Sequence, residues 1–186
     1  MANEKLCEAA CPIARSLGRI GDGWSILILR DSLSGLTRFD EFQRSCNIAT
    51  NILSQRLKNL VDNGFLEKVC YNKKPPRYEY YPTEMTKNFR VVLIAMAEWG
   101  SYYFSPEGRQ IQLVEKNTKR LINPILVDKE TGKEITSEDY ETIIGPAASP
   151  DIQYIFQYIA KKNSLGITEK FLPPSSRINP VSDRFN

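Results

Sequence analysis

Short polar side chains recur at helical spacing between residues 50 and 58. Asn51, Ser54, Gln55 and Lys58 stand at positions i, i+3, i+4 and i+7, and Thr50 precedes them. This spacing places them on one face of a helix. Asparagine and glutamine can pair with adenine through two hydrogen bonds, whereas lysine suits guanine or phosphate. The pattern therefore predicts a helix that presents these side chains to base edges in a DNA groove.

The other face of the same segment is apolar. Leu53, Leu57, Leu60 and Val61 form a stripe that would pack on a core, and the Asn-Gly pair after residue 62 is a stop signal. Arg56 stands between the two faces. Both a contact with guanine or phosphate and a packing or ion-pair role fit this position. Arg56 is therefore a candidate DNA contact with a structural alternative.

A stiff basic segment, NKKPPRYEYYPT, follows at residues 72–83. The runs FLEKVCY and RYEYYPT indicate two strands of a hairpin around it. Proline cannot donate ladder hydrogen bonds, so we expect both Pro75 and Pro76 in the loop. The hairpin tip would then carry Lys73, Lys74 and Arg77 toward phosphates beside the helix.

The charge distribution favours this interpretation more than the total charge does. The whole chain of 186 residues has a net charge of only +3. Between residues 44 and 77, seven basic residues stand against two acidic ones, a local net charge of +5. A local basic surface on a nearly neutral chain is what phosphate contact requires, and a solvated charged face is the alternative.

Three helices are expected to precede this basic region. The first begins at Pro12 and is ended by Gly21 and Gly23, and the second covers WSILILRDSLSG. The third covers TRFDEFQRSC, with Phe39 and Phe42 on one face. In the second helix the side chains expected to be buried are Trp24, Ile26, Leu27, Leu29 and Leu33.

One long helix is expected over EMTKNFRVVLIAMAEWGSYYF, residues 84–104. Its stretch from Val91 to Ala97 is uninterruptedly apolar, so it leaves no face for water. One side would pack on its own domain and the other on the same helix of a second subunit. A buried central helix in a larger monomer is the alternative. We predict a homodimer formed through the N-terminal helix and residues 85–104.

Hydrophobic periodicity is weaker beyond Phe104. We expect a helix over PEGRQIQLVEKNTKRLI, a small hairpin around Thr131-Gly132 and an amphipathic helix over SPDIQYIFQYIAKK, with no internal repeat. The end is rich in Pro, Ser and Asn and is typical of a loose tail. The predicted domains are residues 1–104 for DNA binding and dimerisation, 105–171 for a C-terminal extension and 172–186 for a flexible tail.

Three helices followed by a basic hairpin is the order of a winged helix-turn-helix. The predicted fold is mainly α with a small β-hairpin wing (α+β), dimeric and with a C-terminal α/β extension. The chain resembles the HxlR-type winged-helix transcriptional regulators, relatives of the MarR group, between Cys11 and Gly100. The resemblance rests on the Cys-Pro start, Arg-Phe, Leu-Ser-x-Arg-Leu and Pro-Pro-x-x-x-Tyr.

This resemblance implies a homodimeric bacterial or archaeal DNA-binding regulator. Residues 49–63 would enter the major groove, and residues 72–77 would form the flanking wing. Two positions depart from the family pattern. Asp22 and Gly23 stand where members commonly have glycine and lysine, and Ala49 replaces a frequent serine, which would weaken the helix N-cap.

Some members of this family are thiol switches with a reactive cysteine near the position of Cys11. Here Cys11 precedes Pro12 at a helix start, where the helix dipole favours a thiolate. Cys46 lies just before the DNA-reading helix, so we hypothesise that oxidation joins Cys11 of one subunit to Cys46 of the other. Cys7 is a possible substitute for Cys11, and Cys70 is expected in the core. Four ordinary reduced cysteines are the alternative.

Other classes of function lack their usual signals. The chain has no histidine, no glycine-rich phosphate loop and no Cys-x-x-Cys pair, so no catalytic site, cofactor or metal is expected. No apolar run reaches the ~20 residues that span a bilayer, and a cytoplasmic, nucleoid-associated protein is expected. The expected partners are double-stranded DNA, a second subunit and an oxidant or small effector. The alternative is a winged-helix module for protein contact, or ligand sensing without a thiol switch.

Overall fold

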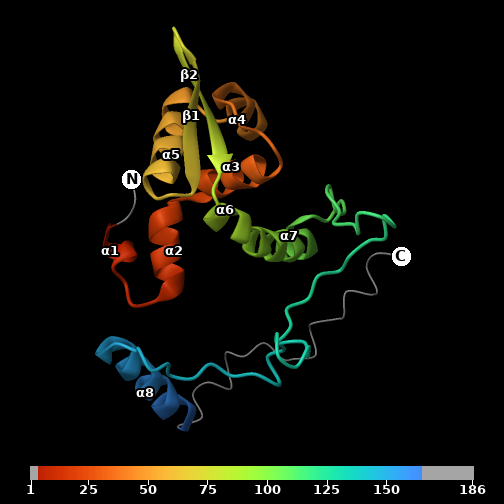
Figure 1. Ribbon diagram of the computed structural model, residues 1–186. Coiled ribbons are helices and arrows are strands. Elements are labelled where there is room, and N and C mark those ends of the chain that lie inside the picture. Colours follow the sequence, from red (N-terminus) through yellow and green to blue (C-terminus); the bar gives the residue numbers. More distant parts are fainter. Residues whose placement is uncertain (1–3, 165–186) are drawn as a thin grey trace. The chain divides into compact units, whose positions relative to one another are not determined.

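The computed structural model describes residues 4–164, which are mainly helical with one two-stranded antiparallel sheet (Figure 1). This confirms the predicted fold, which is mainly α with a small β-hairpin wing. In chain order the elements are α1 (Glu4–Cys7), α2 (Pro12–Ile20), α3 (Gly23–Leu33), α4 (Phe39–Cys46), α5 (Thr50–Asp62), β1 (Leu66–Lys73), β2 (Pro76–Pro82), α6 (Glu84–Asn88), α7 (Arg90–Phe104) and α8 (Pro150–Ser164).

Contacts within the chain divide it into two units, and the boundary in the sequence falls between Asp139 and Tyr140. The first unit contains the elements from α1 to α7, and the second contains α8. The predicted domain boundary after Phe104 lies inside the first unit. The predicted tail, residues 172–186, lies outside the described residues.

The core of the first unit lies where α3, α4, α5 and the base of the hairpin meet. The predicted stripe of α5 is confirmed, because Leu53, Leu57 and Leu60 are at most 1% exposed. Phe42 of α4 and Leu66 of β1 complete the cluster at 0% and 2% exposure. Burying each such side chain stabilises the fold by roughly 1.5–3 kcal/mol, so these helices are held in a fixed arrangement.

The structure corrects the predicted burial in α3. Its buried face consists of Ser25, Ile28, Leu29 and Ser32, which share helical spacing. Trp24 is 39% exposed because it lies beside this face and not on it. Of the other four residues predicted to be buried, Leu29 is buried, and three are half-buried: Ile26, Leu27 and Leu33.

Helices α4 and α5 form a helix-turn-helix. The turn covers residues 47–49, with Asn47 in the left-handed conformation at φ 50° and Ile48 buried beneath it. Ala49 is the N-cap of α5 and provides no side-chain cap, as predicted. The Thr50 hydroxyl instead accepts a hydrogen bond from the Gln43 side-chain amide at 2.9 Å, which ties the start of α5 to α4.

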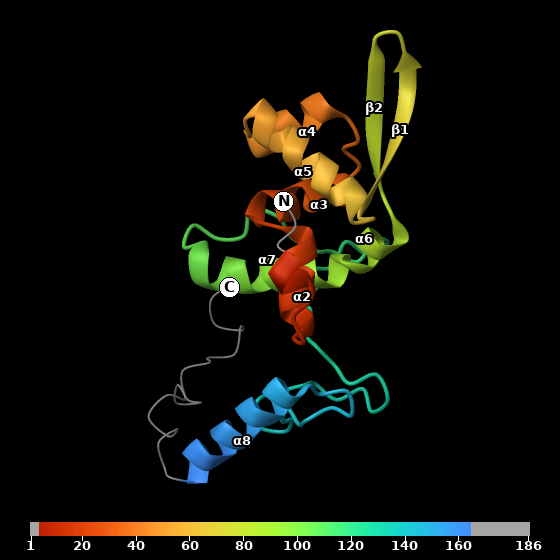
Figure 2. The same ribbon diagram turned by 90° about the vertical axis from the view of Figure 1, so that its left-hand side faces the viewer.

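The hairpin stands out beyond the helices in both perpendicular views (Figures 1 and 2). Its strands pair from Leu66 opposite Pro82 to Lys73 opposite Pro76, with an irregularity between Cys70 and Asn72. Compared with the predicted runs, β1 ends two residues later, at Lys73, and β2 begins one residue earlier, at Pro76. Pro76 belongs to β2, contrary to the prediction that both prolines lie in the loop, because the first residue of a strand need not donate to the ladder.

The long helix predicted over residues 84–104 is two helices, α6 and α7, separated at Phe89. The helical hydrogen bonds are shared there: the Phe89 amide donates to both the Met85 and Thr86 carbonyls, and the Phe89 carbonyl accepts from both the Val92 and Leu93 amides. The buried Thr86 hydroxyl also donates to the Phe65 carbonyl at 2.6 Å and fixes α6 to the core. By contrast, α7 has no buried residue.

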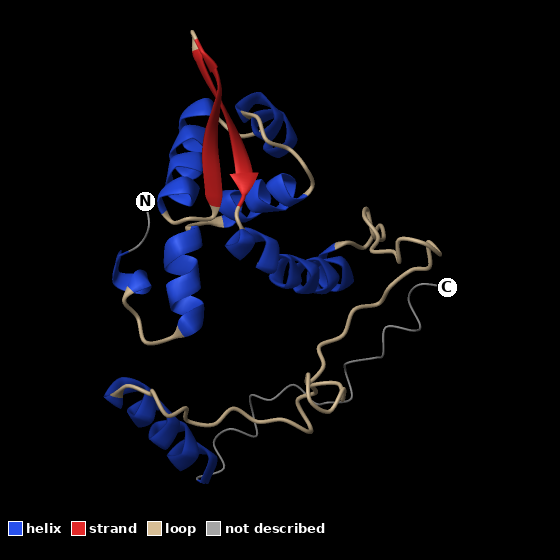
Figure 3. Ribbon diagram, viewed as in Figure 1, coloured by secondary structure: helices blue, strands red, loops and turns tan. Residues whose placement is uncertain are grey.

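Residues 105–149 contain no helix, so the predicted helix over residues 106–122 is wrong (Figure 3). The segment instead contains two hairpin turns, in which Val114 pairs with Leu121 and Val127 pairs with Glu134. The second turn is the hairpin predicted around Thr131-Gly132. The first turn resembles it residue by residue and was not expected.

The two turns share the pattern Leu-Val-acid-Lys-x-Thr-x-base-x-Ile, at residues 113–122 and 126–135. The backbone of each turn is closed by equivalent hydrogen bonds, such as those of the Ile122 amide to the Leu113 carbonyl and the Ile135 amide to the Leu126 carbonyl. Glu115 and Asp128 each accept from backbone amides two or three residues on, which competes with helix formation. An internal repeat of 13 residues is thus present, contrary to expectation.

The second unit, described by itself, contains α8 over Pro150–Ser164, which confirms the predicted helix. None of its residues is buried. In the described part of the chain, no helix has the length and apolar character needed to cross a membrane.

Candidate nucleic-acid interface

The outer face of α5 carries the predicted polar side chains in exposed positions. Asn51, Ser54 and Gln55 are exposed, as are Thr50 and Lys58. The Ser54 hydroxyl donates to the Thr50 carbonyl at 2.8 Å, and Lys58 pairs with Asp62 one turn later. The Gln55 side-chain oxygen accepts from Arg56 Nη1 at 3.3 Å, so the Asn51 side chain and the NH2 group of Gln55 have the greatest capacity to bond to an external partner.

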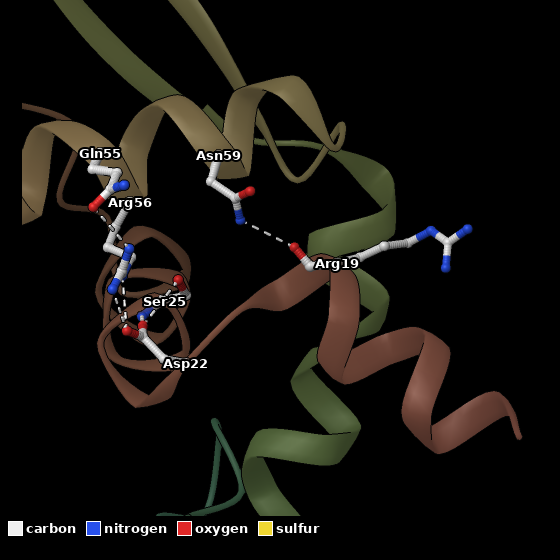
Figure 4. A network of polar contacts seen from close by, with 6 residues as sticks. All are labelled: Arg19, Asp22, Ser25, Gln55, Arg56 and Asn59. Atoms are coloured by element: carbon white, nitrogen blue, oxygen red, sulfur yellow. Dashed lines mark hydrogen bonds and ion pairs between the residues drawn. The ribbon is translucent and has the colours of Figure 1, made fainter. Parts of the chain in front are cut away.

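Arg56 forms an ion pair with Asp22 of the α2–α3 connection, as Figure 4 shows. Its two nitrogens Nη2 and Nε lie 2.6 and 2.8 Å from the same Asp22 oxygen, and its side chain is only 19% exposed. Asp22 also caps α3 by accepting from the Ser25 amide. Burial alone would raise the pKa of Asp22, but Arg56 and the Ser25 amide hold it below its ordinary value.

A second polar contact fixes the other end of α5. The side-chain amide of Asn59 donates to the Arg19 carbonyl at the end of α2, 3.2 Å away (Figure 4). Together with the Arg56–Asp22 pair, this bond holds α5 against two preceding segments. The contacts of Arg56 fit the alternative of a packing or ion-pair role.

The hairpin presents its basic residues to solvent. Lys73, Lys74 and Arg77 are exposed, and within residues 4–164 no carboxylate lies within ion-pair distance of any of them. Lys68 of β1 instead lies over the ring of Tyr78, with its ammonium 3.9 Å from the ring centre. The cations at the tip are thus available for phosphate contact.

A hollow of about 510 Å³ joins the two surfaces. Ser54 and Lys58 line it from α5, and Lys68 and Tyr80 line it from the hairpin. The exposed face of α5 and the base of the wing are therefore adjacent. Of the predicted DNA contacts, Ser54 and Lys58 line this hollow, whereas Lys73, Lys74 and Arg77 lie further out along the hairpin. Arg56 does not line it either, and its Nη1 donates to the Gln55 side-chain oxygen at 3.3 Å.

Arg38 is a further residue at this surface, and sequence reasoning missed it. It lies just before α4, pairs with Glu79 of β2 at 2.9 Å and lies over the Tyr71 ring. The Tyr81 hydroxyl and Arg38 both lower the pKa of Glu79. The Tyr80 amide donates to the Thr37 carbonyl at 2.8 Å, so this segment pairs with the wing. The Arg-Phe motif includes Arg38, but its partner stands 41 residues away.

The candidate redox cysteines have different surroundings. Cys11 is half-buried at the N-cap of α2, and Cys46 is 8% exposed at the end of α4. The Cys46 thiol donates to Asp31 Oδ2 at 3.3 Å, and burial, with that bond, raises its pKa to about 11. Cys70 is exposed, contrary to the prediction that it lies in the core, because its strand stands out from the helices.

Similar proteins share both the sequence and the fold. The model of the HxlR-like helix-turn-helix family matches residues 19–108. Rv3095 of Mycobacterium tuberculosis, an uncharacterized helix-turn-helix-type transcriptional regulator, is 33% identical over 135 residues, which cover 72% of this chain and 85% of the relative.

Two solved structures extend the comparison. PA1374 from Pseudomonas aeruginosa, named as a candidate transcription factor, is 44% identical with a TM-score of 0.57, covering 78% of this chain and 99% of that one. PA1607, named in the same way, is 38% identical with a TM-score of 0.67, covering 75% and 98%. All three relatives are named as regulators or transcription factors and not as enzymes. The chain therefore belongs to the HxlR-like helix-turn-helix family, as its sequence motifs predicted.

Proposed function

We propose that this chain is a homodimeric transcriptional regulator that binds a specific inverted-repeat DNA operator. Helix α5 would enter the major groove with Asn51 and Gln55 toward base edges, and Thr50, Ser54 and Lys58 beside them. Lys73, Lys74 and Arg77 of the wing would contact phosphates alongside. The observation that carries this proposal is the hollow that joins the exposed face of α5 to the base of the wing, whose tip cations have no acidic partner among residues 4–164.

Arg56 has a different place in this proposal. Because Nε and Nη2 of its guanidinium are held by Asp22 and Nη1 donates to the Gln55 side-chain oxygen at 3.3 Å, we assign Arg56 the task of orienting α5 and the Gln55 side chain and not of reading DNA. A regulator of this kind would act in the cytoplasm at the nucleoid, without a cofactor.

The proposed homodimer forms through α2 and residues 85–104. An apolar hollow of about 540 Å³ lies between α2 and the α6–α7 segment, lined among others by Ile13, Leu17, Val92 and Met96. Ile13 and Val92 are 70% and 46% exposed, which a single chain leaves in water. A second copy seated there would cover both, and its α5 would lie about 34–36 Å from the first.

Selection of random duplexes by the reduced full-length protein tests the function. We expect enrichment of two inverted half-sites separated by about one helical turn. Retention without enrichment would mean that phosphate contacts dominate and would remove the sequence-specific part of the proposal. No retention by a folded protein would favour the alternative, a winged-helix module for protein contact.

The thiol switch between Cys11 and Cys46 stays a prediction. The burial of Cys46 beside Asp31 speaks against it in the described conformation, because α4 must open before Cys46 meets a second subunit. Non-reducing electrophoresis after mild oxidant is the test. A dimer band that Cys46→Ser removes supports the switch, and a monomer band throughout favours four reduced cysteines and ligand sensing without a thiol switch.

A further inference from the structure

A second cleft lies on the opposite side of α7 from the proposed dimer surface. We propose that it binds a small molecule with an apolar body and one anionic group, and that this binding changes the affinity for DNA. The regulatory half of this inference rests on the proposed DNA-binding function. The cleft, here the Arg90 cleft, lies between α3, α7 and residues 111–113, within the first unit.

The size and lining of the Arg90 cleft suit such a ligand. Its volume is about 510 Å³, within the roughly 300–1,000 Å³ of small-molecule sites. The apolar wall consists of Leu33 from α3, Leu93 and Ile94 from α7, and Ile111 and Leu113 from the following segment. Apolar walls with a few polar groups are the usual composition of such sites.

The charges of the Arg90 cleft favour an anion. Of its two carboxylates, Asp31 pairs with Arg30 at 2.7 Å, and Glu98 pairs with Arg109 at 2.6 Å. Arg90 donates only to the Leu33 carbonyl at 3.3 Å, and among residues 4–164 it has no carboxylate within ion-pair distance. Its guanidinium can therefore pair with a ligand carboxylate without breaking an existing ion pair.

A short chain of contacts connects the cleft with the DNA-reading helix. Asp31 is buried and divides its carboxylate between two partners, Arg30 through Oδ1 and the Cys46 thiol through Oδ2. Cys46 is the last residue of α4, and the turn into α5 follows it directly. An anion held by Arg90 in the same cleft would repel the Asp31 carboxylate and thereby change the contacts of Asp31 with Arg30 and Cys46. The buried carboxylate of Asp31 thus belongs to the lining of the Arg90 cleft and also contacts the residue at which α4 ends, just before the turn into α5.

Calorimetric titration of the full chain with 2-naphthoate, and with neutral 2-naphthamide of nearly the same shape, tests the ligand class. We expect 2-naphthoate to bind about tenfold tighter, because a hydrogen bond to a charged group is the stronger one. Arg90→Gln should weaken 2-naphthoate about tenfold and leave 2-naphthamide unchanged. Arg15→Gln removes the same charge at the dimer hollow and should change neither.

Three results would overturn the ligand site. These are no heat of binding up to the solubility of 2-naphthoate, equal affinity for acid and amide, and equal effects of Arg90→Gln and Arg15→Gln. Ala97→Phe places a ring inside the Arg90 cleft and should abolish binding of both probes. Retained binding in that variant would place the probe elsewhere.

The second part of the proposal, that ligand binding changes the affinity for DNA, is tested with a duplex obtained by the selection of random duplexes. Saturating 2-naphthoate should change the Kd of the wild-type protein for that duplex at least about fivefold, and should have no effect on Arg90→Gln. An unchanged Kd in the wild type would overturn the regulation while the calorimetric result stands. Failure of the proposed function would look different, because no duplex would then bind even without the probe.

Discussion

At the residue scale, Asp22 serves two elements at once, since it caps α3 and pairs with Arg56 of α5. We predict that Asp22→Ala lowers the free energy of unfolding at pH 7 by about 1–2 kcal/mol, the usual cost of losing an acidic N-cap. The folded pKa of Asp22 lies below its ordinary value of 3.8. The contribution of the Asp22 charge to the free energy of unfolding is therefore complete above pH 3.8, and it disappears as the pH falls through the pKa of Asp22 in the folded protein.

Urea unfolding of wild type and Asp22→Ala between about pH 7 and pH 2 measures this. The difference between the two proteins should shrink toward low pH. Asp62→Ala, which removes an exposed partner of Lys58, is the control and should stay within about 0.5 kcal/mol of wild type. A constant difference at every pH would show that the Asp22 charge is not involved.

Gln55 and Lys74 separate base reading from phosphate contact. Gln55→Ala should alter which base is preferred at one operator position, at a cost of about 1–3 kcal/mol for the original base. Lys74→Ala should weaken all duplexes alike and reduce the slope of log K against log salt by about 1. Binding isotherms over a salt series with operator and scrambled duplexes measure both. Indistinguishable behaviour of the two variants contradicts the assigned roles.

Cys46 should react slowly with alkylating reagents in the folded protein. Its pKa of about 11, against an ordinary 9.0, leaves roughly a hundredfold less thiolate near pH 8, before steric protection is counted. Time-resolved iodoacetamide labelling followed by mass spectrometry gives the rate of each cysteine. Exposed Cys70 serves as the internal reference. Equal rates at Cys46 and Cys70 would show that α4 opens readily and would revive the disulfide hypothesis.

The residue-scale roles were only partly predictable. The outer face of α5 follows from spacing, because one helix fixes all its members relative to one another. The Arg56–Asp22 pair joins residues 34 positions apart, and nothing local distinguishes it from a DNA contact. Asp22 and Arg56 were each noticed separately, as a departure from the family pattern and as a residue between two faces. Only the packing of α3 against α5 brings them together.

At the scale of elements, the wing is held at its base by Arg38 and Glu79. We predict that Glu79→Gln changes the free energy of unfolding little, because ion pairs that water can reach stabilise a fold only weakly. The hairpin should nevertheless move more, with faster hydrogen exchange at the Tyr80 amide and weaker duplex binding. Hydrogen exchange by mass spectrometry measures the first effect.

Glu67→Gln is the matched control for the wing. Glu67 lies on β1, and its substitution makes the same charge change at an exposed position away from Arg38. Exchange at Tyr80 that is equal in the two variants would mean that strand pairing alone holds the hairpin.

The elements were predictable where hydrophobic spacing decides them. Helices α4 and α5 and the hairpin follow from apolar periodicity and stop signals. The split at Phe89 escaped prediction because no glycine or proline marks it, and α6 is fixed instead by the Thr86 bond to Phe65, a contact between distant segments. The absent helix over residues 106–122 had a detectable signal, since an acidic residue followed by Lys-x-Thr recurs at Glu115 and Asp128.

At the scale of the whole molecule, the exposed surface of α7 predicts self-association. Val92→Glu would place a charge in the apolar hollow shared with α2, and we expect the proposed dimer to dissociate at concentrations where wild type is dimeric. Light scattering coupled to gel filtration measures the mass. Val69→Glu is the control, because it makes the same substitution at an equally exposed valine outside the hollow. Val69 is 45% exposed on the wing, and Val92 is 46% exposed.

Dissociation of both variants, or of neither, would place the dimer contact elsewhere. The sequence predicted this surface from the apolar run of residues 91–97, because no helix face there is polar. Which side faces its own domain could not be read from that run. Only the fold shows that α7 has the hollow at α2 on one side and the Arg90 cleft on the other.

The repeated turns at residues 113–122 and 126–135 affect how this part of the chain tolerates changes in length. Each turn brings its own two ends together, with the amide of its last residue bonded to the carbonyl of its first. Removing or adding one unit of 13 residues would therefore alter the number of residues much more than the distance they span. Such a segment can lengthen or shorten by whole units, as in tandem duplication, without displacing the elements that precede it.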